Sequence, residues 1–281
     1  MLEVASVNVN GIRAAHRKGM DLWLKERNPD ILTIQEVRAQ ESDLRGILPD
    51  WNISFDPCSI PGRAGVAIAS KFPPIAVRTK LRANKILNPE TASEEPLNTS
   101  GRWIEADYDI AGKLVTVVSC YVYAGEARTI KQEEKMAFLQ AVEKRMKSLV
   151  KEEFALVTGD FNVGHTTLDI KNWRGNLDKS GFLPEERAYL DALVGNESDK
   201  EYNAGAGQGW IDVVRKIKGG IDGPYTWWSM RGNAFDNDTG WRIDYQFATQ
   251  RLKALWVAID RQKSYAQRWT DHAPVVVKYD F

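Results

Sequence analysis

The sequence has few cysteines, no long apolar run and no excess of either charge. Its two cysteines, Cys58 and Cys120, form no CxxC pair and show no metal-ligand spacing with histidine. This argues against a disulfide framework or a zinc finger, and we expect two reduced thiols in a reducing compartment. No apolar run approaches the roughly 20 residues of a membrane-spanning helix, and we see no signal-peptide pattern. We therefore predict a cytoplasmic protein without membrane contact, of the bacterial type that reaches the nucleoid through DNA.

The charge balance leaves several function classes open. Lys+Arg and Asp+Glu both number 38 among 281 residues, so the formal net charge is zero. A nucleic-acid enzyme can have this balance, because it can concentrate positive charge on one face and carboxylates in its catalytic cleft. No Pro/Gly/Ser-rich linker, internal repeat or low-complexity tract divides the chain. We expect a single catalytic domain that spans residues 1–281.

Short apolar β-rich runs alternate with helical patterns in both halves of the chain. The clearest helix is predicted over 131–151, where apolar residues recur at every third or fourth position. Residues 82–100 have no periodicity and predict a surface loop. The pattern favours two sheets packed face to face with helices outside. Further helices are predicted at 20–26, 184–193 and 211–217, and strands at 2–9, 31–34, 65–70, 75–79, 103–108, 114–121, 154–158, 225–229, 243–249, 252–258 and 274–279.

Polar side chains follow several of these strands at the point where each strand ends. Asn8 and Asn10 close the first strand, Glu36 follows the second, and Asp160 and Asn162 follow the strand after the long helix. Mg²⁺ binds one or two carboxylates and keeps several waters, so Glu36 with Asn8 or Asn10 is a candidate metal site. Each residue also has a structural interpretation, because Asn and Asp are common turn formers.

Two more polar groups stand in the second half, where Asp244 lies within Arg242-Ile243-Asp244-Tyr245 and Asp271-His272 precedes the final strand. With them the chain resembles the exonuclease III family of abasic-site (AP) endonucleases, within the endonuclease/exonuclease/phosphatase superfamily. The resemblance implies a DNase I-like four-layer α/β sandwich, in which two mixed sheets are flanked by helices. The matching strings follow the family's order over nearly the whole chain: Asn8-Val9-Asn10-Gly11-Ile12-Arg13, Ile34-Gln35-Glu36, Gly159-Asp160-Phe161-Asn162-Val163, Gly181-Phe182-Leu183-Pro184-Glu185-Glu186-Arg187, Tyr225-Thr226-Trp227-Trp228, Trp241-Arg242-Ile243-Asp244-Tyr245 and Asp271-His272-Ala273-Pro274-Val275.

The resemblance also implies a metal ion and a base. Glu36 is expected to be the main Mg²⁺ ligand, helped by Asn10 and Asp271, with Mn²⁺ as the alternative ion. Asp160 is expected to activate the attacking water, and Asn8 to orient it. The implied reaction is in-line hydrolysis at phosphorus without a covalent enzyme intermediate.

Further catalytic roles follow from the same resemblance. Asn162 and His272 are expected to donate hydrogen bonds to the scissile phosphate as its negative charge grows. Asp271 is expected to hold the tautomer of His272 and to favour its protonated form. Tyr121 ends a strand where the family places a tyrosine that contacts phosphate, and Asp244 is expected to support the metal or the histidine.

The substrate expectation depends on a small apolar pocket and on basic residues. Trp227, Trp241 and Ile243 match the family's pocket for a flipped abasic sugar, which would exclude normal nucleotides by size. They also have an alternative interpretation as aromatic residues of a sheet core. Arg128 and Arg231 are expected to meet DNA. The substrate-binding set is completed by His165, which has a structural or a DNA-facing interpretation, and further basic residues stand where DNA phosphates could be met: Arg13, Arg17, Lys18, Lys131, Lys171 and Arg174.

The sequence therefore predicts a Mg²⁺-dependent DNA repair nuclease that cleaves the backbone 5′ of abasic sites, with 3′→5′ exonuclease and 3′-repair phosphodiesterase activity. Its expected partner is double-stranded DNA with abasic sites or 3′ blocks, and a monomer is expected. Two alternatives remain open at this stage. One is a general Mg²⁺ phosphodiesterase acting on undamaged nucleic acid, and the other is a DNA-binding homologue without catalysis.

Overall fold

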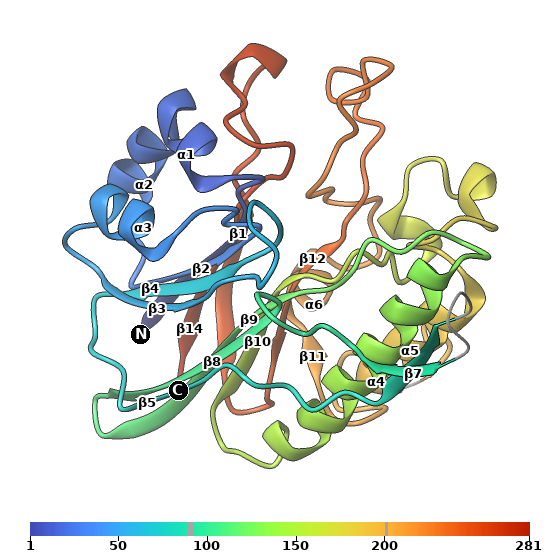
Figure 1. Cartoon of the computed structure of the whole chain (residues 1–281), viewed down its shortest axis with the longest axis horizontal. Helices are drawn as coiled ribbons and strands as arrows, with labels where there is room; N and C mark the ends of the chain where they lie inside the picture. The colour runs from blue at the N-terminus through green and yellow to red at the C-terminus, as the bar shows by residue number, and fades with distance from the viewer. Residues whose placement is uncertain (89–92, 200–201) are drawn as a thin grey trace.

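The computed structural model describes residues 1–88, 93–199 and 202–281 (Figure 1). The helices are α1 (Ile12–Ala15), α2 (Asp21–Arg27), α3 (Glu41–Ile47), α4 (Ile130–Leu149), α5 (Pro184–Val194) and α6 (Val213–Lys218). The strands are β1 (Leu2–Asn8), β2 (Ile31–Gln35), β3 (Asn52–Asp56), β4 (Val66–Ser70), β5 (Ala76–Arg78), β6 (Lys85–Asn88), β7 (Ser93–Pro96), β8 (Trp103–Ile110), β9 (Lys113–Tyr121), β10 (Ala155–Asp160), β11 (Ile211–Asp212), β12 (Asp244–Ala248), β13 (Lys253–Ile259) and β14 (Val275–Asp280).

Two mixed sheets form the centre of the fold. One has the strand order β13-β14-β1-β2-β4-β3 and the other β11-β12-β10-β9-β8-β5. The β1–β2 and β9–β10 pairs are parallel, and the other pairs in these two sheets are antiparallel. Apolar side chains from both sheets make one core between them, including Val4, Ile31, Val117 and Leu156. Because each sheet buries its inner face this way, the two stack as layers.

Helices cover the outer face of each sheet, as Figure 1 shows. Trp23 of α2 and Leu44 of α3 pack with Leu32 of β2 in a second core. On the other side, α4 and α5 pack against β9, β10 and β12 in a third core, to which α4 contributes Phe138 and Val142. The expected DNase I-like four-layer α/β sandwich is therefore confirmed.

The predicted helix over 131–151 is confirmed with slightly earlier bounds, Ile130–Leu149. Thr129 caps it, because its side chain accepts a hydrogen bond from the backbone N–H of Lys131. The predicted helix over 211–217 begins later than expected. Ile211–Asp212 form β11, and the Asp212 side chain then caps α6 by accepting from the Arg215 N–H.

Two predictions of secondary structure were wrong, one of a strand and one of a loop. Residues 225–229 form no strand, and Trp227 makes only isolated bridges to Trp241 and His272. In addition, the Thr226 hydroxyl accepts from the N–H groups of Ile243 and Asp244, where a regular strand would use its backbone carbonyls. The predicted loop 82–100 contains the antiparallel pair β6–β7, while residues 89–92 lie outside the described part. Strand β3 and helix α3 were not predicted.

No helix in the described part of the chain is long and apolar enough to cross a membrane.

Candidate active site

Strand register brings the predicted polar residues to one end of the two sheets. In one sheet Asp160 of β10 pairs with Asp244 of β12 on one side and with Tyr121 of β9 on the other. In the other sheet Asn8 of β1 lies beside Gln35 of β2, immediately before Glu36. The Asn8 Nδ2 donates to Asp160 Oδ2 across the sheet interface at 2.9 Å, so the two sheets meet at Asp160.

Asp160 is a buried carboxylate surrounded by donors. Its Oδ1 accepts from the backbone N–H of Asn162 at 2.9 Å, and its Oδ2 also accepts from Asn162 Nδ2 at 3.2 Å. Burial raises the pKa of Asp160 to about 7 with help from the charge of Asp244, although His272 and the hydrogen bond from Asn8 act in the opposite direction. A carboxyl with this pKa exchanges a proton near neutral pH, as a general base requires.

His272 is held by Asp244 and faces Asp160. Its Nδ1 lies 2.8 Å from Asp244 Oδ2, and its Nε2 lies 3.9 Å from Asp160 Oδ2. Burial lowers the pKa of His272, but the charge and hydrogen bond of Asp244, together with the charges of Asp160 and Asp271, outweigh burial and raise the pKa to about 10. The imidazole is therefore protonated at neutral pH, with Nε2–H available as a donor.

This geometry corrects one part of the role expected for Asp271, while its charge does help to keep His272 protonated. The side chain that holds His272 Nδ1 is Asp244. Asp271 instead accepts from Asn10 Nδ2 at 3.0 Å and from the Trp227 indole N–H at 3.1 Å. Burial raises the pKa of Asp271, but the charge of His272 and these two hydrogen bonds outweigh it and leave the pKa below its ordinary range.

Glu36 forms a second centre of negative charge at the end of β2. Its carboxylate accepts a hydrogen bond from the Tyr121 hydroxyl and pairs with Arg38 Nη2 at 2.7 Å. Burial, together with the charges of Glu36 and Asp160, raises the pKa of Tyr121 well above its ordinary value, so the phenol stays protonated as a donor. Backbone φ angles near 50° at Asn10, Glu36 and Asn162 indicate that the chain adopts uncommon conformations at this site.

The donor set suits a hard cation. Asp160, Asp244 and His272 offer ligand atoms within 4.8 Å of one another. Asp244 Oδ1 is buried without a hydrogen-bond partner among the described residues, so one carboxylate oxygen remains for a cation or water. A protonated His272 has no lone pair for a metal, however, and it fits better as a donor. Glu36, Asn10 and Asp271 carry carboxylate and amide oxygens, the type of ligand that Mg²⁺ prefers.

Two tryptophans stand beside this centre. The Trp227 and Trp241 rings meet edge to face with centroids 6.0 Å apart, and each backbone N–H donates to the other's carbonyl at 2.9 Å. Both are half-buried, while Ile243 is buried. The backbone bridge from Trp227 to His272 ties this aromatic pair to the polar centre.

The outer predicted residues divide into two groups. Arg128 and Arg231 are exposed, as are the basic residues Arg13, Arg17, Lys18, Lys131, Lys171 and Arg174. The position of His165 contradicts a substrate contact and favours its structural interpretation. The ring is only 2% exposed, and its Nε2 lies 2.8 Å from Asp191 Oδ1, so the imidazole packs inside the fold.

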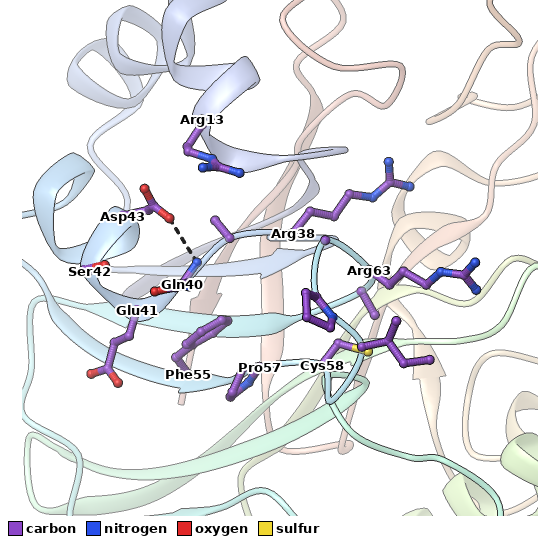
Figure 2. Close-up of a pocket in the computed structure, with 15 residues that line it drawn as sticks. Arg13, Arg38, Gln40, Glu41, Ser42, Asp43, Phe55, Pro57, Cys58 and Arg63 are labelled. Atoms are coloured by element: carbon purple, nitrogen blue, oxygen red, sulfur yellow. Dashed lines mark hydrogen bonds between the residues drawn. The ribbon is translucent and has the colours of Figure 1, made fainter.

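Sequence reasoning missed a cavity beside the site, shown in Figure 2. This cavity of about 650 Å³ is lined by three arginines, Arg13, Arg38 and Arg63, and by the carboxylates of Glu41 and Asp43. Arg38 connects it to Glu36. Only Arg13 was expected to face DNA. The Pro- and Gly-rich turn around Arg63 was a usable signal, because such a turn lies at the surface and exposes its one charged side chain.

Comparisons with known proteins agree with this geometry. The chain is 27% identical to an exodeoxyribonuclease of Bacillus subtilis over 276 residues, 98% of both chains. It is 25% identical to a DNA-(apurinic or apyrimidinic site) endonuclease of Dictyostelium discoideum over 99% of this chain and 71% of that one. An AP endonuclease structure from Archaeoglobus fulgidus superposes with a TM-score of 0.78 at 27% identity, covering all of both chains. Residues 5–272 match one family throughout, and the chain belongs to the Endonuclease/Exonuclease/phosphatase family.

Proposed function

We propose that the chain is a Mg²⁺-dependent AP endonuclease that hydrolyses the DNA backbone 5′ of abasic sites, with 3′→5′ exonuclease and 3′-repair phosphodiesterase activity in base excision repair. The relatives described as an exodeoxyribonuclease and as an AP endonuclease support the substrate class. The observation that carries the proposal is the buried Asp160 carboxylate, which lies 3.9 Å from the Nε2 of a His272 held by Asp244. This arrangement supplies a base and a cationic donor at the same point.

Mg²⁺ would be held by Glu36, Asn10 and Asp271, with Mn²⁺ as the alternative ion. When bound, the ion would polarise the phosphoryl group and stabilise the negative charge that develops in the reaction. The protein's own residues perform the proton and positioning steps. Asp160 accepts a proton from the attacking water, while Asn8 and Asn162 orient its carboxylate through their hydrogen bonds.

Donors then act on the phosphate. His272 is protonated, and its Nδ1 is occupied by Asp244, so Nε2–H is the group that meets the growing negative charge. Tyr121 keeps its hydroxyl proton and adds a second donor. Asn162 Nδ2 also donates to the Val122 carbonyl at 2.9 Å, which fixes the amide plane beside Asp160.

Selectivity is assigned to the aromatic pair and Ile243. Trp227 and Trp241 are half-buried beside the polar centre, and a deoxyribose without a base is small and apolar enough to lie against them. A nucleotide with its base is excluded by size. The exposed Arg128 and Arg231 would contact the duplex outside this pocket.

The deciding experiment compares cleavage of a duplex with one abasic analogue and of the intact duplex, with and without Mg²⁺. The proposal expects Mg²⁺-dependent cleavage 5′ of the analogue and much slower attack on intact DNA. Equal rates on both duplexes would favour the general phosphodiesterase. Binding of abasic DNA without Mg²⁺-dependent cutting would favour the non-catalytic homologue.

We further propose that the chain acts in the cytoplasm as a monomer with a single catalytic domain.

A further inference from the structure

A buried lysine lies beneath the proposed catalytic loops. Lys135 is on α4, and its side chain is fully excluded from solvent. Its ammonium lies 2.6 Å from Glu186 Oε1 and donates to the backbone carbonyl of Asn162 at 2.9 Å. It also reaches the Ala124 carbonyl at 3.2 Å and the Ser180 hydroxyl at 3.3 Å. A single cation therefore contacts three separate segments of the chain.

Glu186 completes this cluster from the Gly181–Arg187 motif. Its Oε2 accepts from the N–H groups of Gly181 and Leu183 at 2.7 and 2.9 Å, and its Oε1 accepts from Gln132 Nε2 at 2.8 Å. These donors and Lys135 satisfy a carboxylate that is fully buried. A buried charge pair with this many hydrogen bonds is rigid in position, because any movement would leave a charge or a polar group unpaired.

The segments held by Lys135 are those that carry the reaction. Asn162 donates its N–H to Asp160 from a backbone φ of 52°, a left-handed conformation that asparagine adopts more readily than most residues. The carbonyl of the same residue accepts from Lys135. Ala124 follows the β9 strand that ends at Tyr121, and Gly181 lies so close to Trp241 that a Cβ there would come within 2.7 Å of the indole.

We propose that Lys135, paired with Glu186, is a positioning residue that fixes Asn162 and the loop after Tyr121 in their reactive arrangement. The inference rests on the proposed roles of Asp160 and Asn162. It also gives the Gly181–Arg187 motif a physical role, since this motif supplies the carboxylate that retains the Lys135 charge inside the fold. No substrate contact is assigned to Lys135 itself.

The test compares Lys135→Met with a matched control on the same helix. Lys147 lies near the end of α4, is 59% exposed and pairs with Glu143 of the same helix, so Lys147→Met removes the same charge without touching the loops. For Lys135→Met we expect kcat on abasic DNA to fall by roughly 10- to 100-fold, as small misplacements of reacting groups do, while KM changes little. Lys147→Met should keep the wild-type kcat.

A double variant separates positioning from the mere stability of the ion pair. Lys135→Met leaves Glu186 unpaired, whereas Lys135→Met/Glu186→Gln removes both buried charges and should recover much of the lost melting temperature. Because the Asn162 carbonyl still lacks its donor, kcat should remain low. The proposal is overturned if kcat recovers along with the melting temperature. It is also overturned if neither variant folds, because Lys135 would then stabilise the whole domain.

Hydrogen exchange supplies a readout that does not depend on activity. In the wild type, the N–H groups of Asn162 and Gly164 are bonded to Asp160 and to the Gly181 carbonyl. Exchange over residues 161–165 should accelerate about tenfold or more in the double variant and stay unchanged in Lys147→Met. Unchanged exchange in the double variant refutes the positioning role. If the wild type failed to cut abasic DNA, the proposed function would be wrong. The exchange result would still show whether Lys135 positions Asn162.

Discussion

Replacement of Asp244 by asparagine tests the charge pair that keeps His272 protonated. The substitution preserves size and one oxygen that can face Nδ1, but it removes a negative charge 2.8 Å from the ring. In the wild type burial lowers the pKa of His272, but this charge and its hydrogen bond, together with the charges of Asp160 and Asp271, raise the pKa to about 10. Without it, burial opposes the remaining charges of Asp160 and Asp271, and the pKa should fall toward its ordinary value of about 6.5.

The magnitude follows from the fraction of protonated imidazole. The cationic form of His272 exists below its pKa and is lost as the pH rises through it. At a pH of about 8, a pKa near 10 leaves about 99% of the rings protonated, whereas a pKa near 6.5 leaves about 3%. The rate at that pH should therefore fall on the order of 30-fold, which is less than the roughly 10²- to 10³-fold that complete loss of one transition-state donor costs.

The assay is single-turnover cleavage of an abasic duplex over a series of pH values. For the wild type, activity should rise as Asp160 ionises near its pKa of about 7 and fall as His272 loses its proton near about 10. In Asp244→Asn the alkaline limb should move toward neutral pH and the optimum toward acid. The acid limb should shift slightly downward as well, because the charge of Asp244 helps to raise the pKa of Asp160.

Asp271→Asn is the matched control, since Asp271 is adjacent to His272 in sequence but bonds to Asn10 and Trp227. Its alkaline limb should move toward neutral pH by less than in Asp244→Asn, because the charge of Asp271 contributes less to the raised pKa of His272. Its Mg²⁺ requirement should rise because a proposed ligand is lost. The reasoning fails if Asp271→Asn moves the alkaline limb and Asp244→Asn leaves it in place. That result would make Asp271 the partner of the histidine.

Three further substitutions test the other roles. Asp160→Asn should lower the single-turnover rate by about 10²- to 10⁴-fold, while DNA affinity measured by fluorescence anisotropy holds or rises, and a near wild-type rate would refute the proposed base. Glu36→Ala should weaken the Mg²⁺ dependence of cleavage more than DNA binding, and an unchanged Mg²⁺ titration excludes Glu36 as the main ligand. Trp241→Ser should reduce the preference for abasic over intact DNA in a competition assay. Unchanged selectivity with a large loss of overall activity would indicate that Trp241 is a core residue.

The sequence predicted the location of the site because strand ends are readable from pattern. Asn8 and Asp160 each follow an apolar β-rich run, and both runs belong to parallel pairs whose ends meet at one edge of their sheets. The pairing of Asp244 with His272 was not readable in this way. Adjacent residues in extended chain point to opposite sides, so Asp271 cannot easily face the ring that follows it, whereas antiparallel pairing of β12 with β10 brings Asp244 alongside Asp160.

Other misses share a cause, since each depends on contacts distant in sequence. The position of His165 after the Asp160 motif left a structural and a DNA-facing interpretation open, because its burial depends on Asp191 of α5 and on Tyr202. The β6–β7 pair carries exposed polar residues and so lacks the apolar alternation that predicts a strand. Arg38 is identified as a site residue by its ion pair with Glu36, which the sequence pattern does not predict.

The proposed base and donor act together only because the fold holds them apart. Between pH values of about 7 and about 10, Asp160 is ionised and His272 is protonated at the same time. At 3.9 Å these groups attract each other but form no hydrogen bond, so the proton stays on the ring. Asn8 and Asn162 restrain the carboxylate, and Asp244 restrains the imidazole. Each group therefore enters the reaction in its charged form, the one able to accept a proton and the other able to donate to phosphate.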